Sequence, residues 1–188
     1  MGGMTTTIQT TDRYARALAY ACKQHDGTFR DDNKTPYAVH PIRVAEYLRR
    51  LAHEEDENVL IAALLHDTIE DTGITFDSVA ALFGDDVAQL VGELTNDNRL
   101  PKARRRSLMM EHLSSLSARA KRIKLADRLD NVSDLLNGMG TPEKRVRYAD
   151  ETARLLNGCA GACKPIEDAL KEALERLRQL NSQMFDRS

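Results

Sequence analysis

The sequence predicts an all-α protein, a helical bundle that forms a single domain. Apolar residues recur at helical spacing almost everywhere along the chain, and the alternating pattern of strands is hard to find. Hydrophobic residues make up 41% of the sequence and aromatic residues 5%, with no Trp, so the core should consist of Leu, Ala, Val and Ile. A chain of 188 residues suits one domain and is long enough to bury such a core.

The N-terminal part of the chain contains three expected helices. Pro41 opens the second, because Pro is well placed at a first helical position. The third, residues 58–66, is apolar nearly all round, which predicts a central buried helix. The first has an apolar face made of Tyr14, Leu18, Ala21 and Cys22.

Further helices are expected to begin at capping residues or prolines. Thr75 can cap a short helix that ends at Gly84. The run Thr141-Pro142-Glu143 combines a cap, a first-turn Pro and a first-turn acid, which is a strong helix start. Other starts are expected at Asp85 or Asp86, Pro101, Ser117 and Pro165. The polar loops 27–37 and 96–101 are expected to carry function.

The bulk properties indicate a globular protein with one main domain. We expect a disordered leader in residues 1–10, the domain in residues 11–160, and a C-terminal amphipathic helix in residues 161–188 packed on the same domain.

The net charge of −2 gives no general reason to expect binding to nucleic acid or to a membrane. No apolar run approaches the roughly 18 residues of a membrane span, and residues 1–10 contain no apolar signal region. A cytoplasmic location is therefore the default expectation. The three cysteines are too few and odd in number for a disulfide framework.

The segment with most chemical information is residues 64–71. His66 and Asp67 end an apolar helix, and Glu70 and Asp71 follow within one turn. Burying ionisable side chains is unfavourable unless something pairs them, and a divalent cation lowers the cost for several carboxylates at once. The pattern favours a metal site. The alternative is a helix end that meets solvent, with Glu70 and Asp71 simply exposed.

Two further residues are candidates for the same site. His40 lies directly before an expected helix, although a lone His is more often a satisfied core or surface residue than a metal ligand. Asp127 lies in the middle of an apolar stripe, where a buried acid needs a partner. That partner could be a metal ion, and Lys124 and Arg128 are the alternatives.

The order of these residues resembles the metal signature of the HD-domain phosphohydrolases: an isolated His, a His-Asp pair and a distant Asp. The sequence motifs around these residues resemble the hydrolase domain of RelA/SpoT-type proteins. They lie at residues 37–41, 62–71, 83–84 and 125–131. Residues 93–102 look most like the stand-alone small alarmone hydrolases, including the metazoan ones. The resemblance covers roughly residues 12–160.

The resemblance implies an HD-domain helical bundle with a buried site for one divalent metal, typically manganese. By the same resemblance Glu70 and Asp71 stand at the catalytic acidic pair. The implied reaction is hydrolysis of the 3′-pyrophosphate of guanosine tetra- or pentaphosphate, which releases pyrophosphate and GDP or GTP. Imidazole and carboxylate ligands also suit iron or zinc, so residue types alone leave the metal open. The implied metal ligands are His40, His66, Asp67 and Asp127.

A highly anionic nucleotide needs cations and polar groups around the site. The resemblance points to five substrate-binding residues: Arg30, Tyr37, Lys102, Asn131 and Arg145. Each also has an ordinary structural interpretation, because Arg and Lys commonly remain solvated, Tyr37 could pack on the core and Asn131 could bond to backbone. Arg104, Arg105 and Arg106 could extend the pocket or form a solvated helix face.

Three positions depart from the family pattern. Asp31 stands where many relatives have Lys, Asp130 where they often have His or Tyr, and Asp134 where the long bifunctional enzymes have Thr. These departures leave the metal ligands unaffected but put base recognition in doubt. The adenine alarmone ppApp and NADPH are therefore alternative substrates, and a catalytically inactive nucleotide-binding module is a third possibility. The expected partner is a small nucleotide, and the oligomeric state stays open.

Overall fold

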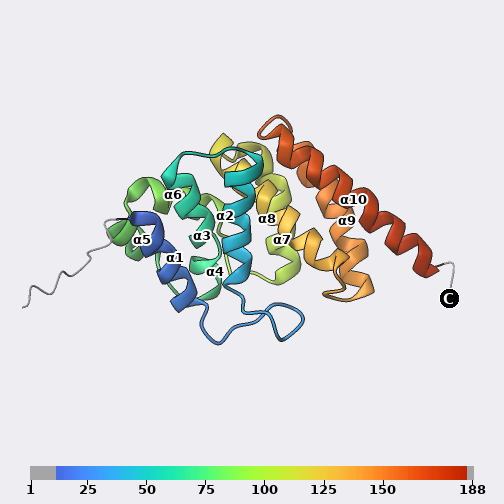
Figure 1. Ribbon diagram of the computed structural model, residues 1–188, viewed down its shortest axis with the longest axis horizontal. Coiled ribbons are helices and arrows are strands. Elements are labelled where there is room, and N and C mark those ends of the chain that lie inside the picture. The colour runs from blue at the N-terminus through green and yellow to red at the C-terminus, as the bar shows by residue number, and fades with distance from the viewer. Residues whose placement is uncertain (1–11, 186–188) are drawn as a thin grey trace, which may run out of the picture.

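A computed structural model of the protein describes residues 12–185, apart from the side chains of Lys102, Met184 and Phe185. Within this part of the chain all regular secondary structure is helical, and the one β-bridge joins Phe29 to Pro36 (Figure 1). The all-α prediction is confirmed. The helices are α1 (Arg13–Gln24), α2 (Val39–Leu51), α3 (Glu57–Leu65), α4 (Thr68–Asp71), α5 (Phe76–Phe83), α6 (Asp85–Leu94), α7 (Lys102–His112), the 3-10 helix η1 (Leu113–Ser115), α8 (Ala118–Leu136), α9 (Pro142–Gly158) and α10 (Lys164–Phe185).

Helix α3 lies at the centre of the N-terminal half of the bundle. Asp56 caps it by accepting a hydrogen bond from the backbone N–H of Asn58, and every residue from 59 to 65 is buried. Its neighbours are α1, α2, α6 and α8. A helix that is apolar all round must be covered on every side, so its sequence fixes its central position. His66 and Asp67 follow it directly and are thereby carried to the end of the buried helix.

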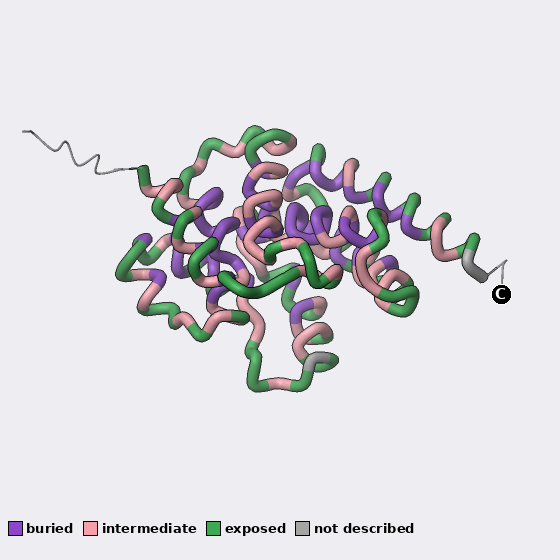
Figure 2. Tube along the Cα trace, turned by 60° about the horizontal axis from the view of Figure 1, so that its bottom comes forward, coloured by how far each residue is buried: buried purple, intermediate pink, exposed green. Residues whose placement is uncertain are grey.

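Helix α8 links the two halves of the bundle. It packs against α2 on one side and against α9 and α10 on the other. Buried residues of α10, including Ile166, Leu170 and Leu177, lie along one side of that helix, which borders the bundle in Figure 1 and shows a buried stripe in Figure 2. No helix of the described chain is both long and apolar enough to cross a membrane.

The helix caps agree with the sequence analysis more closely than the helix faces do. Thr75, Ser117 and Thr141 each accept a hydrogen bond from a backbone N–H in the first turn. Gly84 ends α5 with a φ of 95°, a conformation that favours glycine. Two details differ. Helix α2 begins at Val39, before Pro41, and Cys22 of α1 is exposed while Ala17 and Ala21 are buried. The expected leader, residues 1–10, lies outside the described residues.

Candidate metal centre and its surroundings

Side chains from α2, α8 and the end of α3 converge at one point inside the bundle. His40 Nε2 lies 3.5 Å from Asp67 Oδ2 and 3.4 Å from Asp127 Oδ1. His66 Nε2 lies 3.1 Å from the same Asp67 oxygen and 3.9 Å from the same Asp127 oxygen. The four residues singled out as metal ligands are therefore brought together from distant parts of the chain.

The cluster fits a divalent cation. One ligand atom each from His40, His66 and Asp67 lies within 4.8 Å of the others, a spacing that a shared ion can bridge. His66 Nδ1 donates to the Ala63 carbonyl oxygen at 2.8 Å, so Nε2 is the ring nitrogen that faces the cluster and that would bind a metal on losing its proton. That Nε2 atom is buried and makes no hydrogen bond. A buried imidazole nitrogen that faces carboxylate oxygens and makes no hydrogen bond is suited to bind a metal ion.

The electrostatics of the cluster are those of closely packed opposite charges. Burial alone would raise the pKa of Asp67, but the two histidines hold it well below its usual value. Burial alone would lower the pKa of His40, yet hydrogen bonds with Asp127, Asp130 and Asp67 raise it well above its usual value. Protons on the imidazoles thus balance the carboxylates. A cation entering the cluster would take over that balance and displace protons.

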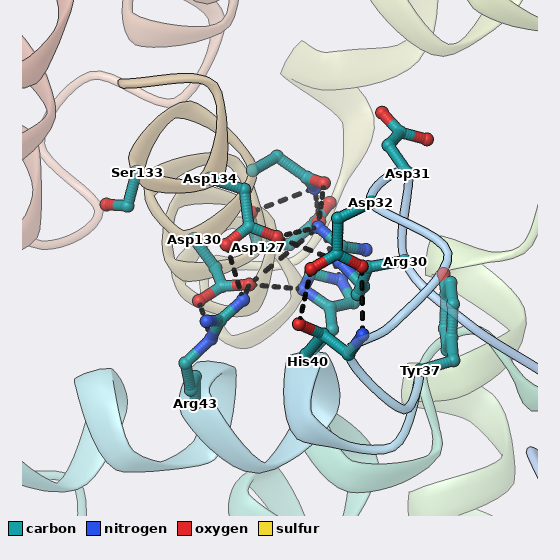
Figure 3. Close-up of polar contacts among 12 residues, drawn as sticks. Arg30, Asp31, Asp32, Tyr37, His40, Arg43, Asp127, Asp130, Ser133 and Asp134 are labelled. Atoms are coloured by element: carbon teal, nitrogen blue, oxygen red, sulfur yellow. Dashed lines mark hydrogen bonds and ion pairs between the residues drawn. The ribbon is translucent and has the colours of Figure 1, made fainter. Parts of the chain in front are cut away.

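Asp130 orients His40 from behind. Its side chain is completely buried and accepts a hydrogen bond from His40 Nδ1 at 2.7 Å, which directs Nε2 toward the cluster (Figure 3). Arg43 Nε lies 2.7 Å from the other oxygen of Asp130, and Arg43 Nη2 lies 2.7 Å from Asp134. Asp134 also forms an ion pair with Arg30, whose Nη2 atom lies 2.8 Å from Asp134 Oδ2.

The sequence analysis noted Asp130 and Asp134 only as departures and did not single out Arg43. Their spacing from the expected metal ligands could have identified them. Asp130 stands three residues after Asp127 in α8, and Arg43 three residues after His40 in α2, so each shares a helix face with an expected ligand.

Three neighbours hold the carboxylates of the cluster. Tyr37 Oη donates to Asp67 Oδ2 at 2.7 Å. Lys124 Nζ lies 2.9 Å from Asp127 Oδ2, so the lysine alternative considered from the sequence is realised at one oxygen of this carboxylate. Asn131 Nδ2 donates to the other oxygen, Oδ1, which is the one that faces the histidines. The side chain of Asp127 is therefore fixed in both position and direction.

The two carboxylates of α4 have different surroundings. Glu70 Oε1 accepts from Arg105 Nη1 at 2.7 Å, and its Oε2 accepts from the Asn96 side chain at 2.8 Å. Asp71 is exposed as a residue, but partial burial of its carboxyl group and the charges of Asp67 and Glu70 raise its pKa to about 6. Glu70 is thus fixed by an ion pair with Arg105, while the raised pKa of Asp71 lets its carboxyl group carry a proton at mildly acidic pH. Arg105 and Asn96 had not been assigned to this role from the sequence.

Comparison with known proteins agrees with this geometry. Residues 17–161 match the HD domain. The chain belongs to the HD-domain family. It is 41% identical over 158 residues to the guanosine-3′,5′-bis(diphosphate) 3′-pyrophosphohydrolase MESH1 of Xenopus tropicalis, covering 82% of this chain and 88% of that protein. The human MESH1 protein is 42% identical over 164 residues, covering 85% and 92% respectively.

A solved structure gives the same result in three dimensions. It is described as a metazoan ortholog of SpoT that hydrolyses ppGpp and plays a role in starvation responses. It superposes on 88% of this HD-domain protein and 96% of its own chain, with a TM-score of 0.84 and 38% sequence identity. The resemblance to the small alarmone hydrolases is therefore confirmed in sequence and in fold.

The residues expected to bind substrate are placed unequally in this HD domain. Tyr37 and Asn131 touch the carboxylates of the metal cluster, as described above. The Arg30 side chain is 10% exposed, and it is bonded to Asp134 and to Asn131 Oδ1. The side chain of Lys102 lies outside the described residues. Arg145 is half-buried at the start of α9. A direct role of these residues in binding substrate stays a prediction.

The departure at Asp31 also has a structural counterpart. Its carboxylate forms an ion pair with Lys144 of α9, more than 100 residues away in the chain. The pair ties loop 27–37 to the start of α9. Because Lys144 is engaged in this ion pair, it is less available to bind a phosphate group.

Proposed function

We propose that this protein is a metal-dependent hydrolase that removes the 3′-pyrophosphate from guanosine 3′,5′-bis(diphosphate)-type alarmones. One observation carries the proposal. His40, His66, Asp67 and Asp127 converge on a single point beside Glu70 and Asp71, in a chain 41% identical to a protein named for that reaction. The products are pyrophosphate and GDP, or GTP from the pentaphosphate.

The metal is proposed to be one divalent ion, and manganese is the first candidate because oxygen and imidazole donors suit it. His40, His66, Asp67 and Asp127 would hold it, with Asp130 and Tyr37 fixing the direction of two of these ligands. Such an ion, when bound, polarises a phosphoryl oxygen and increases the acidity of water.

Glu70 and Asp71 have separable roles in the proposed reaction. Glu70, positioned by its contact with Arg105, would orient the attacking water and accept its proton. Asp71, whose pKa is raised to about 6, would deliver a proton to the departing 3′-oxygen of the ribose. Burial of the Asp127 carboxylate in α8 would exclude bulk water from one side of the reacting phosphate.

Two specific observations keep an adenine alarmone as a second candidate. Asp31 stands in place of a family lysine and pairs with Lys144, and Arg30 is engaged by Asp134. Both reduce the free positive charge near the expected base region, so guanine preference does not follow from these residues.

A panel of substrates separates these possibilities. Protein loaded with manganese is given ppGpp, ppApp and NADPH, and the products are separated by chromatography. We expect equimolar pyrophosphate and nucleoside diphosphate from ppGpp, and none from Asp67→Ala. Free phosphate from NADPH without pyrophosphate from either alarmone would overturn the proposal. Tight binding of ppGpp without turnover would instead indicate an inactive nucleotide-binding module.

A further inference from the structure

A cavity of about 190 Å³ lies between α7, α8 and α9, next to the metal cluster. Glu70 and Lys124 form part of its wall, and Lys124 is bonded to Asp127. The cavity therefore opens on Glu70, and Lys124 separates it from Asp127. Its volume is below the roughly 300–1,000 Å³ of pockets for drug-sized ligands, so it suits a small inorganic group better than a nucleoside.

The charge of the cavity wall is strongly positive. Six basic side chains line it, against two acidic ones. The basic residues are Arg105, Arg106, Lys124, Arg128, Lys144 and Arg147. Arg105 is paired with Glu70, Lys124 with Asp127 and Lys144 with Asp31, so these three cations are already balanced. The excess of guanidinium groups that remains around the cavity favours an anion with more than one charge.

Glu151 is the remaining acid, and three arginines share it. Its carboxylate lies 3.7 Å from Arg106, 3.4 Å from Arg128 and 3.6 Å from Arg147. These separations are longer than the 2.7–2.9 Å of strong charge-assisted hydrogen bonds. One carboxylate thus holds three arginines loosely, and a phosphate group, with more oxygens and more charge, would satisfy them better.

Tyr148 keeps these cations in place without neutralising them. The guanidinium carbons of Arg128 and Arg147 lie 4.5 and 5.7 Å from the centre of its ring, and Lys144 Nζ lies 5.3 Å from it. The face of an aromatic ring attracts cations but does not use up their hydrogen-bond donors. The donors of the two arginines therefore stay available for an anion, whereas Lys144 is already paired with Asp31.

We propose that this cavity is the compartment for the terminal phosphate of the substrate's 3′-pyrophosphate group, and hence for the pyrophosphate product. The proposal rests on the proposed function. In that reaction a water oxygen forms a bond to the phosphorus next to the ribose, and the bond from that phosphorus to the 3′-oxygen breaks. The proton from water passes to the carboxylate pair, and a proton is returned to the 3′-oxygen. The terminal phosphate stays attached to the attacked phosphorus throughout and leaves as part of pyrophosphate.

The first test is direct binding of inorganic pyrophosphate, measured by calorimetry on metal-stripped protein in the presence of a chelator. Arg147→Gln should weaken binding about tenfold, the size expected for a charge-assisted contact at a partly exposed site. Arg154→Gln, an exposed arginine two turns further along α9, is the matched control and should leave binding unchanged. Glu151→Gln should tighten binding several-fold, because it removes the competing carboxylate.

The opposite signs of the two changes distinguish an anion site from a structural cluster. Loss of a purely structural ion pair would not improve pyrophosphate affinity in Glu151→Gln. Equal pyrophosphate affinity in wild type, Arg147→Gln and the double variant Arg106→Gln/Arg147→Gln would overturn the inference. Circular dichroism confirms that each variant is folded.

The same variants separate failure of the inference from failure of the proposed function. If ppGpp is hydrolysed and Arg147→Gln changes neither its KM nor product inhibition by pyrophosphate, the function stands and the cavity assignment is wrong. If no alarmone is hydrolysed but pyrophosphate binds and responds to both substitutions as described, the cavity assignment stands and the proposed function is wrong.

Discussion

Replacing Asp130 with Asn tests whether the direction of His40 depends on the carboxylate behind it. The two side chains have nearly the same shape, so the change removes charge and one acceptor site without leaving a cavity. Asp130 is fully buried, and its 2.7 Å contact is with the ring nitrogen of His40 that points away from the cluster. Losing a partner of this kind typically weakens metal binding or activity by about 10- to 100-fold, or about 1.4–2.7 kcal/mol.

The predicted loss has an upper limit set by Arg43. This arginine loses its contact with Asp130 in the variant but keeps Asp134 at 2.7 Å, and about a third of its side chain is exposed (34%). Its charge is therefore not left unpaired in the core, and the fold should survive the substitution.

Manganese titration by calorimetry is the assay for Asp130→Asn. The matched control is Asp134→Asn, which weakens the same arginine network but makes no contact with His40. We expect about tenfold or greater loss of manganese affinity in Asp130→Asn and a loss of less than about threefold in Asp134→Asn. Equal affinity in wild type and Asp130→Asn, or equal losses in the two variants, would refute the reasoning.

Four further predictions follow from the same geometry. Glu70→Gln should retain manganese but lose at least about 100-fold in kcat; an unchanged kcat removes Glu70 from proton transfer. Tyr37→Phe deletes the 2.7 Å bond to Asp67 and should weaken manganese binding by about three- to tenfold in calorimetry, whereas wild-type affinity would make this contact incidental. Because the pKa of His40 is raised, protons compete with the metal well above the usual histidine range, so manganese affinity should fall steadily as the pH is lowered from above that range into it; a flat profile contradicts this. Leu64→Ala in the buried α3 should lower the free energy of unfolding by about 2–5 kcal/mol in urea titrations, and a loss below about 1 kcal/mol would show that α3 is not central.

The helices and their ends were readable from local sequence because the physics that sets them is local. A cap at Thr141 needs only its own hydroxyl and the next turn, and residues 58–66 indicate a buried helix by composition alone. The same holds for the residues of the candidate metal cluster. A His-Asp pair at the end of an apolar helix is unfavourable without a counter-charge, whatever the fold.

The contacts around the cluster were not readable because they join distant segments. Arg43 and Asp130 are separated by 87 residues, and the sequence alone gives no distance between α2 and α8. Arg105 appeared as one of three consecutive arginines with a solvated face as the simpler interpretation, but in the structure it binds Glu70. The exposure of Cys22 was missed for another reason. At the edge of the apolar face of α1, one helical position decides between core and solvent.

The most direct test of the central claim is reconstitution of activity in metal-stripped protein. Manganese is added in steps while pyrophosphate release from ppGpp and bound metal are both measured. The account predicts no release in the stripped protein and a rise that saturates at one ion per chain, with neither binding nor release in Asp127→Ala. Full pyrophosphate release in the presence of chelator, or unchanged metal binding by Asp127→Ala, would contradict it.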